Sequence, residues 1–413
     1  MGLGISKSLR SRCDVAIVGA GPAGAWAAYT LARRGARVTM FDPSHPREKP
    51  CGGGVTGRAL ALVDDAVGAA RFPHCVIRSA RFVDSESGQS AGVSLDPGRA
   101  ATDSSLIVAS RAVFDAALLA GAQRAGATLE TARVRHLRVE AGGVRIETAQ
   151  GTHRADVVIG ADGANSLVRR SVAQPFTRRQ LSIATGYFAH GVTSDEIIIE
   201  LILDPPGYLW SFPRPDHLAI GICAQADTGV TAHRLRARAA AWIRDAHLTV
   251  GAELESYSWP IPSLTVRDLQ TIDLAGPSWC LVGDAAGLVD PITREGIYFA
   301  LASGALAADA IAAGDLVRYA ADVERELVRE LVLAARLKAG FFRPDFTELL
   351  VRGLQGSGAI REVMADIVAG RQSYAGLKWR LLTTMEWRLA WKMLVSARNS
   401  HRARERERRD DRC

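Results

Sequence analysis

The chain has 413 residues, a length that predicts two or three structural units large enough to enclose a sizeable cofactor. Hydrophobic residues make up 48% and charged residues 23%, which excludes wholesale disorder, and no apolar run approaches the roughly 18 to 20 residues of a membrane-spanning helix. The formal net charge is +7, and the six cysteines form no CxxC pair and have no histidines at metal-ligand spacing. We therefore expect a cytoplasmic, reduced protein without a metal site.

The N-terminal part of the chain predicts a nucleotide-binding unit. Residues 1–12 lack a signal-peptide core and are expected to be flexible, and "DVAIVGAGPAGAWAAYTLARRGARVTMFD" then reads as strand, glycine turn, helix and strand. Gly19 permits the tight turn, Gly21 lets the backbone approach a pyrophosphate, and Gly24 lets helix and strand pack closely. Asp42, at the end of the second strand, can accept hydrogen bonds from ribose hydroxyls. The complete pattern favours a dinucleotide site over a merely structural glycine turn.

Further along the chain, a helix is predicted from about Ser110 to Ala125. Between Val172 and Val266, runs such as "EIIIELIL", "GYLWSF" and "HLAIGICAQ" predict an antiparallel sheet. From about Leu316 onward the chain reads as helices. The expected organisation is a discontinuous nucleotide-binding domain (13–80, 100–171 and 270–315), a substrate-binding sheet domain (81–99 and 172–269), a helical region (316–398) and a disordered charged tail (399–413).

Three motifs in a fixed order resemble those of the flavoprotein hydroxylase superfamily. They are the N-terminal GxGxxG, "GADG" at Gly160 to Gly163 and "GDAAG" at Gly283 to Gly287, and the resemblance extends from about Cys13 to Gly314. It implies an α/β fold with a Rossmann-like FAD-binding domain and an inserted antiparallel β-sheet substrate domain, followed here by the helical C-terminal region.

The same resemblance assigns roles to individual residues. It implies that Asp284, which follows Gly283, hydrogen-bonds the ribityl chain of FAD and that Arg111 also reaches the cofactor. Asp162 is expected near the nucleotide, in a stretch also associated with NAD(P)H.

The loop "PITREGIYFA" completes the expected cofactor site through Pro291, Gly296 and Ile297, and it also contains a departure from the family. Many relatives carry glycine where Arg294 stands. If the position requires a positive φ, arginine costs free energy there, although it can also place a cation near the N1 and O2 atoms of reduced flavin. The departure leaves FAD binding expected and the choice of electron donor open.

Two further stretches resemble the geranylgeranyl reductase branch of the superfamily. They are "KPCGGG" and "PPGYLWSFP", which fits PxxYxWxFP. On a strand, Tyr208, Trp210 and Phe212 point to one face because side chains alternate. Such a stripe usually belongs to a core, but beside a flavin it can form the wall of a tunnel for a prenyl chain, and we favour the tunnel.

By resemblance, the loop that carries Cys51 lies against the isoalloxazine ring. Gly53 and its neighbouring glycines would let substrate and backbone come close to that ring. Cys51 and Tyr208 are the candidate catalytic residues, as proton donors, whereas Gly53, Tyr208, Trp210 and Phe212 are the candidate substrate-binding residues. The alternative for Cys51 is a buried inert thiol.

The combined prediction is an FAD-dependent reductase that saturates carbon-carbon double bonds of a prenyl chain, with NAD(P)H or ferredoxin as electron donor. The alternative is an FAD-dependent monooxygenase or halogenase acting on an aromatic or natural-product substrate, because one fold supports both chemistries. A third class is a flavin-binding sensor without catalysis. The substrate can be a prenyl diphosphate, a lipid, a quinone tail, a chlorophyll side chain or a natural-product intermediate.

Residues 374–398 predict a basic, tryptophan-bearing helix. Such a helix can contact a membrane peripherally, and packing on the protein's own surface is the alternative. Basic residues are not interleaved with aromatic ones elsewhere, so nucleic acid is not expected as a partner. The sequence predicts no oligomeric state.

Overall fold

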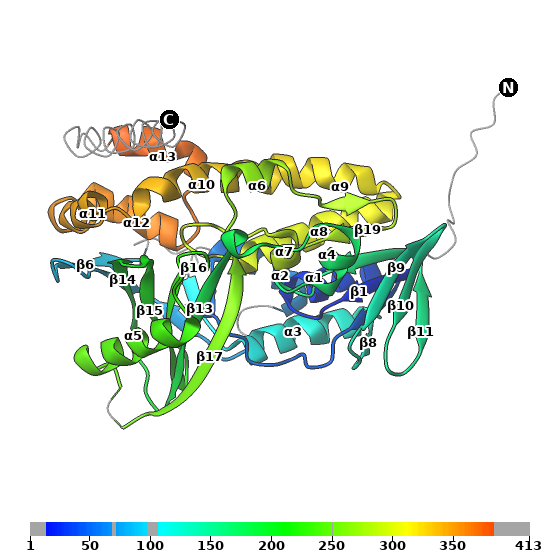
Figure 1. The fold of residues 1–413 in the computed structure, drawn as a ribbon, viewed down its shortest axis with the longest axis horizontal. Helices are drawn as coiled ribbons and strands as arrows, with labels where there is room; N and C mark the ends of the chain where they lie inside the picture. The colour runs from blue at the N-terminus through cyan, green and yellow to red at the C-terminus, as the bar shows by residue number, and fades with distance from the viewer. Residues whose placement is uncertain (1–13, 68–71, 97–105, 250, 384–413) are drawn as a thin grey trace.

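The computed structural model describes residues 14–67, 72–96, 106–249 and 251–383. Figure 1 shows a nucleotide-binding half, coloured blue to teal, beside a second sheet that is mostly green, and the yellow and orange C-terminal helices run along both. The ends predicted to be flexible or disordered, residues 1–12 and 399–413, lie outside the described residues.

The nucleotide-binding half is built on a six-stranded sheet in the order β18-β19-β12-β1-β2-β8. β1 (Asp14–Val18) pairs in parallel with β2 (Arg37–Phe41) and with β12 (Val157–Gly160). The other strands are β8 (Thr128–Glu130), β18 (Ala275–Gly276) and β19 (Trp279–Leu281). The carboxyl ends of the parallel strands meet at one edge, which is where open α/β sheets bind ligands.

Helices cover this sheet: α1 (Pro22–Arg33), α2 (Gly57–Val67), α3 (Arg111–Arg124), α4 (Leu167–Val172), α7 (Gly283–Ala286) and α8 (Ile297–Ala313). α1 packs between α3 and α8. A Cβ at Gly304 of α8 would lie 2.6 Å from the carbonyl oxygen of Ala23, so this close packing requires glycine. α3 confirms the helix predicted from Ser110 to Ala125.

Two three-stranded sheets flank the main one. A meander of β9 (His136–Glu140), β10 (Gly143–Glu147) and β11 (Thr152–Ala155) forms the right-hand end of the molecule in Figure 1. The second sheet joins β3 (Gly54–Val55), β7 (Leu106–Val108) and β4 (Cys75–Ile77). β3 begins at Gly54, the last residue of the KPCGGG stretch, so this sheet anchors one end of that loop.

The second half is a seven-stranded sheet in the order β17-β13-β16-β15-β14-β5-β6, and only the β14–β5 pair is parallel. Its strands are β5 (Ser79–Asp84), β6 (Ser90–Ser94), β13 (Leu181–His190), β14 (Glu196–Leu203), β15 (Pro206–Pro213), β16 (His217–Gln225) and β17 (Glu253–Pro262), and a short 3-10 turn (Arg178–Gln180) leads into it. α5 (Ala232–Asp245) covers one face by packing on β13 and β16. The inserted antiparallel sheet is therefore present, while the predicted domain boundaries stay predictions.

The C-terminal region is helical as far as Thr383, as predicted. It consists of α9 (Leu316–Val323), a π-helical turn (Glu324–Val328), α10 (Arg329–Phe341), α11 (Pro344–Gly356), α12 (Gly358–Val368) and α13 (Tyr374–Thr383). A short helix earlier in the chain, α6 (Val266–Gln270), lies between β17 and the last strands of the six-stranded sheet. α11 and α12 pack on β6, and α13 packs on α10 and α12. Within the described residues, no helix is long and apolar enough to span a bilayer.

Candidate functional site

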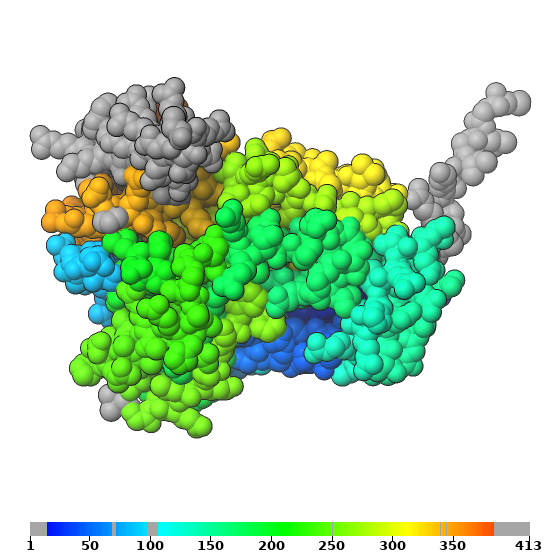
Figure 2. All heavy atoms as spheres, viewed as in Figure 1, coloured from blue at the N-terminus to red at the C-terminus, as the bar shows by residue number. Residues whose placement is uncertain are grey.

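One cavity of about 1440 Å³ connects the two halves of the molecule. Its first part, which we call the cofactor end, is lined by the glycine turn, the ends of β1, β2 and β12, and charged residues such as Asp42, Lys49, Arg111 and Asp284. Figure 2 shows the blue N-terminal segment that builds this end recessed between the green sheet and the teal meander. Its second part, the apolar end, lies between the seven-stranded sheet and α10 to α13.

The three glycines of the turn have distinct constraints. Gly19 has φ +104°, and an added Cβ would lie 2.3 Å from the carbonyl oxygen of Ala161. A Cβ at Gly24 would lie 2.0 Å from the carbonyl oxygen of Gly19. Gly21 lines the cavity, and its Cβ would meet nothing closer than His45 Nε2 at 3.5 Å. α1 begins directly after Gly21 without a side-chain cap, so its N-terminal N–H groups are available to an anion in the cavity.

Asp42 lines the cavity at the end of β2 and organises the loop that follows it. Its carboxylate accepts hydrogen bonds from the N–H groups of Ala20 at 3.0 Å and Ser44 at 2.9 Å. It also accepts one from His45 Nδ1 at 2.8 Å. Burial opposes ionisation, but His45 and the backbone N–H groups hold the pKa of Asp42 well below its usual range. A ribose hydroxyl would therefore meet an ionised, already oriented carboxylate.

Arg111, at the start of α3, is buried in the cavity wall. Its Nε and Nη2 donate to the two carboxylate oxygens of Asp115 at 2.8 and 2.7 Å. Burial opposes the charge of Arg111, yet Asp115 raises its pKa, so the guanidinium stays charged and is held in one orientation. The second carboxylate oxygen of Asp115 also lies 3.4 Å from His45 Nε2, which links Arg111 to the Asp42 loop.

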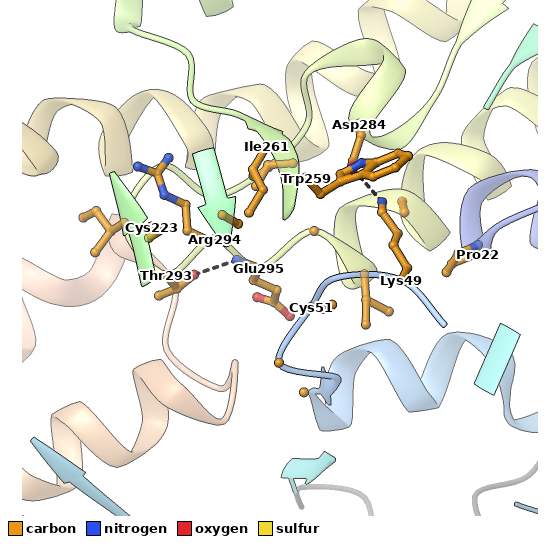
Figure 3. A pocket seen from close by; sticks show the side chains of 18 of the residues that line it. Pro22, Lys49, Cys51, Cys223, Trp259, Ile261, Asp284, Thr293, Arg294 and Glu295 are labelled. Carbon is orange, nitrogen blue, oxygen red and sulfur yellow. Dashed lines mark hydrogen bonds and ion pairs between the residues drawn. The ribbon is translucent and has the colours of Figure 1, made fainter. Parts of the chain in front are cut away.

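Asp284 forms an ion pair across the cavity that the sequence motifs did not assign. Lys49 Nζ lies 3.0 Å from Asp284 Oδ2, as the dashed line in Figure 3 shows. Gly283, before Asp284, has φ +54°, and a Cβ at Gly296 would lie 3.4 Å from Asp284 Oδ1. The glycines thus keep room around this carboxylate, and the signal for Lys49 was its place within KPCGGG.

The remaining predicted cofactor residues differ in how they meet the cavity. Asp162 lines it, but its carboxylate accepts from the N–H groups of Leu167 at 2.6 Å and Val168 at 3.2 Å and so caps α4. Burial raises the pKa of Asp162. Gly296 and Ile297 line the cavity at the start of α8, whereas Gly24, Gly283 and Pro291 are not among its lining residues.

Arg294 has φ +61°, so the left-handed conformation, which costs free energy for a residue other than glycine, is present at this position. Its Nη1 donates to Ser263 Oγ at 2.5 Å, and Lys338 Nζ donates to the same oxygen at 2.6 Å. Burial, together with the charge of Arg294, lowers the pKa of Lys338 to about 7. Arg294 lies at one end of the view in Figure 3, beside Cys223. Lys338 sits in an ordinary helix sequence, so nothing in the local pattern indicated it.

The KPCGGG loop bridges the two ends of the cavity. Gly53 has φ +85°, and its Cβ would lie 2.3 Å from the carbonyl oxygen of Ala109. A Cβ at Gly52 would lie 3.0 Å from the ring of Phe212 on β15. The Sγ of Cys51 accepts a hydrogen bond from the Gly53 N–H at 3.3 Å and lines the cavity. Glycine is therefore required for the loop to pass between the start of α3 and the seven-stranded sheet.

The aromatic stripe of β15 faces the cavity. Tyr208, Trp210 and Phe212 all line it, and the Tyr208 hydroxyl donates to the carbonyl oxygen of Thr293 at 3.1 Å. Burial raises the pKa of Tyr208 well above its ordinary value, with a contribution from Cys223, so the phenol stays protonated at neutral pH.

The apolar end continues beyond this stripe toward the C-terminal helices. The helical residues that line it are mostly apolar: Leu333, Leu337, Phe341, Phe346, Leu350, Ile360, Val363, Met364, Ile367, Val368, Leu377, Leu381 and Leu382. Among the described lining residues of this sheet and of α10 to α13, the only charged side chains are Arg336 and Lys378, and both are exposed. They therefore mark an opening of the cavity to solvent.

Comparison with known proteins agrees with this geometry. A family model described as an FAD binding domain matches residues 12–313. A chloroplastic geranylgeranyl diphosphate reductase of Oryza sativa subsp. japonica is 30% identical over 354 residues, which cover 76% of this chain and 72% of that protein. The chain belongs to the geranylgeranyl reductase family of FAD-dependent oxidoreductases.

Two further similar proteins carry different names. A menaquinone reductase of Mycolicibacterium smegmatis is 28% identical over 368 residues, covering 83% of this chain and 87% of that protein. A geranylgeranyl bacteriochlorophyll reductase-like protein of Thermoplasma acidophilum has the same fold, with a TM-score of 0.74 and 23% identity over 90% of this chain and 99% of that one.

The residues of the cofactor end fit FAD. The uncapped N-terminus of α1 and the open space at Gly21 suit a pyrophosphate, and Asp42 offers an ionised acceptor for a ribose. The cavity continues past Asp284 to the Cys51 loop, where the indole Nε1 of Trp259 has no hydrogen-bond partner among the described residues. An extended dinucleotide can therefore run from the turn to this loop.

Proposed function

We propose that the protein reduces carbon-carbon double bonds of a prenyl chain. The observation that carries this proposal is the continuity of the cavity, in which a charged end that fits FAD opens into an apolar end beside Cys51 and Tyr208. A long apolar chain matches the mostly apolar lining of that end, because burying it there removes its surface from water.

The chain's own residues supply orientation, dryness and a proton. When bound and reduced by the electron donor, FAD would supply the hydride equivalent that adds to one alkene carbon. The Cys51 thiol, from the loop between the two ends, is the candidate donor of the proton to the other carbon, and the protonated Tyr208 phenol is the second candidate. Trp210 and Phe212 hold the prenyl chain against the loop and exclude water.

We infer that the head group of the substrate is anionic and lies at Arg336 and Lys378. Among the described lining residues of the seven-stranded sheet and of α10 to α13, no carboxylate accompanies these two exposed cations. A neutral quinone head would gain little from them, whereas a phosphate or diphosphate can pair with both. The electron donor is proposed to be NAD(P)H or ferredoxin.

The experiment is an anaerobic screen of prenyl compounds with different heads. The flavin of the purified protein is reduced with dithionite, and the protein is mixed with geranylgeranyl diphosphate, geranylgeraniol or menaquinone. The masses of the products are measured by mass spectrometry. A gain of two hydrogens in the diphosphate supports the proposal. Product formation only after air is admitted, with oxygen or halogen inserted into another substrate, supports the monooxygenase or halogenase alternative. Flavin binding without any product supports the sensor alternative.

Membrane contact through 374–398 is proposed as a way to collect such a substrate. Residues 384–398 lie outside the described residues, but α13 is present, and its Trp379 is 74% exposed beside the cavity-lining Lys378. An exposed indole next to a cation suits a lipid headgroup region.

A further inference from the structure

An arginine is the largest fully buried side chain in the described part of the chain. Arg214 is 0% exposed and directly follows Pro213, the last residue of the aromatic motif on β15. A buried guanidinium costs free energy unless it is paired and hydrogen-bonded. No motif of the sequence assigned it a role, so its position calls for a physical reason.

The contacts of Arg214 converge on the KPCGGG loop. Its Nη2 donates to the carbonyl oxygen of Cys51 at 2.7 Å, and its Nη1 donates to Glu48 Oε1 at the same distance. Its Nη1 also lies 3.0 Å from His217 Nε2. Burial and the charge of Arg214 lower the pKa of His217, so the neutral imidazole can accept at Nε2 while Nδ1 donates to Asp216 at 2.7 Å.

Glu48 extends this network to the cofactor end. Its carboxylate accepts from the N–H of Arg111 at 3.2 Å and from the hydroxyl of Ser110, at the N-terminus of α3. Burial opposes its ionisation, but Arg214 and Ser110 lower the pKa of Glu48. The ion pair between Arg214, just after β15, and Glu48, just before the KPCGGG loop, therefore connects the seven-stranded sheet to this loop. The contacts of Glu48 extend the connection to the start of α3.

The same part of β15 also limits how the loop can move. The Phe212 ring packs on Gly52, and a Cβ at Gly53 would lie 3.2 Å from Arg214 Nε. Arg214 thus holds the loop at the carbonyl oxygen of Cys51, while the Phe212 ring of β15 packs against its glycine. A shift of β15 would thus move the thiol and the wall of the apolar end together.

We propose that Arg214 is a positioning residue for Cys51. Arg214 holds the loop so that the Cys51 thiol faces the double bond of a prenyl chain that lies against β15. This inference rests on the proposed function only for the identity of the substrate. A displacement of about 1 Å in a reacting group can cost roughly a hundredfold in rate. Because the substrate is held by other residues, we expect the loss in kcat and not in KM.

The test compares Arg214→Lys with Arg178→Lys in the FAD-loaded protein. Arg178 likewise donates to a backbone carbonyl, that of Ala226, through two hydrogen bonds, but it does not line the cavity. Lysine keeps the charge and cannot make the forked contact. We expect Arg214→Lys to keep its FAD and lower kcat at least about tenfold with KM unchanged, and Arg178→Lys to behave as the wild type.

A second readout does not depend on turnover. The alkylation rate of Cys51 by iodoacetamide, followed on its peptide by mass spectrometry across pH, should rise severalfold in Arg214→Lys and stay unchanged in Arg178→Lys. If Arg214→Lys does not fold, Glu48→Gln serves in its place, because it removes the charge partner of Arg214, and the same changes are expected. Unchanged kcat and unchanged alkylation in a folded variant overturn the inference. If the wild type reduces no prenyl compound, the proposed function fails, whereas the alkylation profile still decides the role of Arg214.

Discussion

The two ends of the cavity are constructed in opposite ways. The cofactor end depends on backbone geometry, with glycines whose Cβ atoms would collide with carbonyl oxygens and charged side chains that are paired before any ligand arrives, such as Lys49 with Asp284 and Arg111 with Asp115. The apolar end depends on side chains from strands and helices far apart in sequence, and among the described lining residues of the seven-stranded sheet and of α10 to α13 the charged ones lie at the opening. The first end should tolerate almost no substitution, and the second should tolerate changes that preserve volume and polarity.

The largest expected effect concerns the glycine turn. Gly24→Ala should destabilise the protein by about 1–3 kcal/mol and abolish FAD binding, because its Cβ would lie 2.0 Å from the carbonyl oxygen of Gly19. Gly21→Ala should keep the melting temperature and still weaken FAD binding, because its Cβ would point into open cavity space. Thermal unfolding and flavin content measure both effects. Gly92→Ala, where a Cβ would meet nothing within 4 Å, is the control. Normal flavin content in both turn variants would contradict the assigned cofactor end.

The second effect concerns the loop between the ends. Cys51→Ala should lower kcat for prenyl reduction about a hundredfold while FAD stays bound, because it removes the first candidate proton donor. Tyr208→Phe should have a smaller effect, about tenfold, because its hydroxyl already donates to Thr293. Single-turnover flavin reoxidation measures both rates. A wild-type rate in Cys51→Ala would show that the thiol is inert.

The third effect concerns the opening of the apolar end. Arg336→Gln combined with Lys378→Gln should raise KM for geranylgeranyl diphosphate about tenfold with kcat unchanged, because a phosphate loses two charge partners. Geranylgeraniol, which lacks the phosphates, should be unaffected by the substitutions. Arg329→Gln, on the same helix but outside the lining, is the matched control. Equal use of both compounds by the wild type would remove the anionic-head inference and leave the prenyl reduction standing.

The fourth effect is a pH dependence of stability. The pKa of Lys338 falls from 10.5 to about 7 in the folded protein because of burial and the charge of Arg294. Between these values the unfolded chain binds more protons, so the free energy of unfolding should rise with pH, by less than about 1.4 kcal/mol per pH unit. Lys338→Met should flatten this rise between about pH 7 and 10, and Lys378→Met, at an exposed lysine, should not. Urea unfolding across this range gives the slopes, and equal slopes in the wild type and Lys338→Met would contradict the assignment.

The smallest effect concerns the surface of α13. Trp379→Ala should reduce binding to vesicles of mixed neutral and anionic phospholipids severalfold, because it removes an exposed indole from the opening. Co-sedimentation measures the bound fraction, and Val317→Ala, at another exposed apolar residue that lies on α9, is the control. Undiminished binding of Trp379→Ala would favour a helix whose exposed indole has no membrane role.

The contrast between the ends also explains what could be predicted from the sequence. GxGxxG, GADG and GDAAG each encode a local backbone conformation that can be recognised from the sequence. Gly19, Asp42 and Asp284 were predicted in this way, and all three line the cavity where the parallel strands end. Alternation on one strand was sufficient to place Tyr208, Trp210 and Phe212 on a common face.

Contacts between distant segments could not be predicted in this way. Arg214 meets Glu48 across 166 positions of sequence, and Lys49 meets Asp284 across 235. The apolar lining of α10 to α13 has the same residue types as any helix that packs on a core. Only the tertiary arrangement leaves a cavity there, and only that arrangement brings Lys338 beside Arg294.

The most direct test of prenyl reduction is a stopped-flow mixing of dithionite-reduced protein with geranylgeranyl diphosphate in the strict absence of oxygen. Reappearance of oxidised flavin absorbance at a rate that depends on the prenyl compound, in step with a product heavier by two hydrogens, is the predicted result. Flavin that stays reduced with every prenyl compound and reoxidises only when oxygen is admitted would contradict the account.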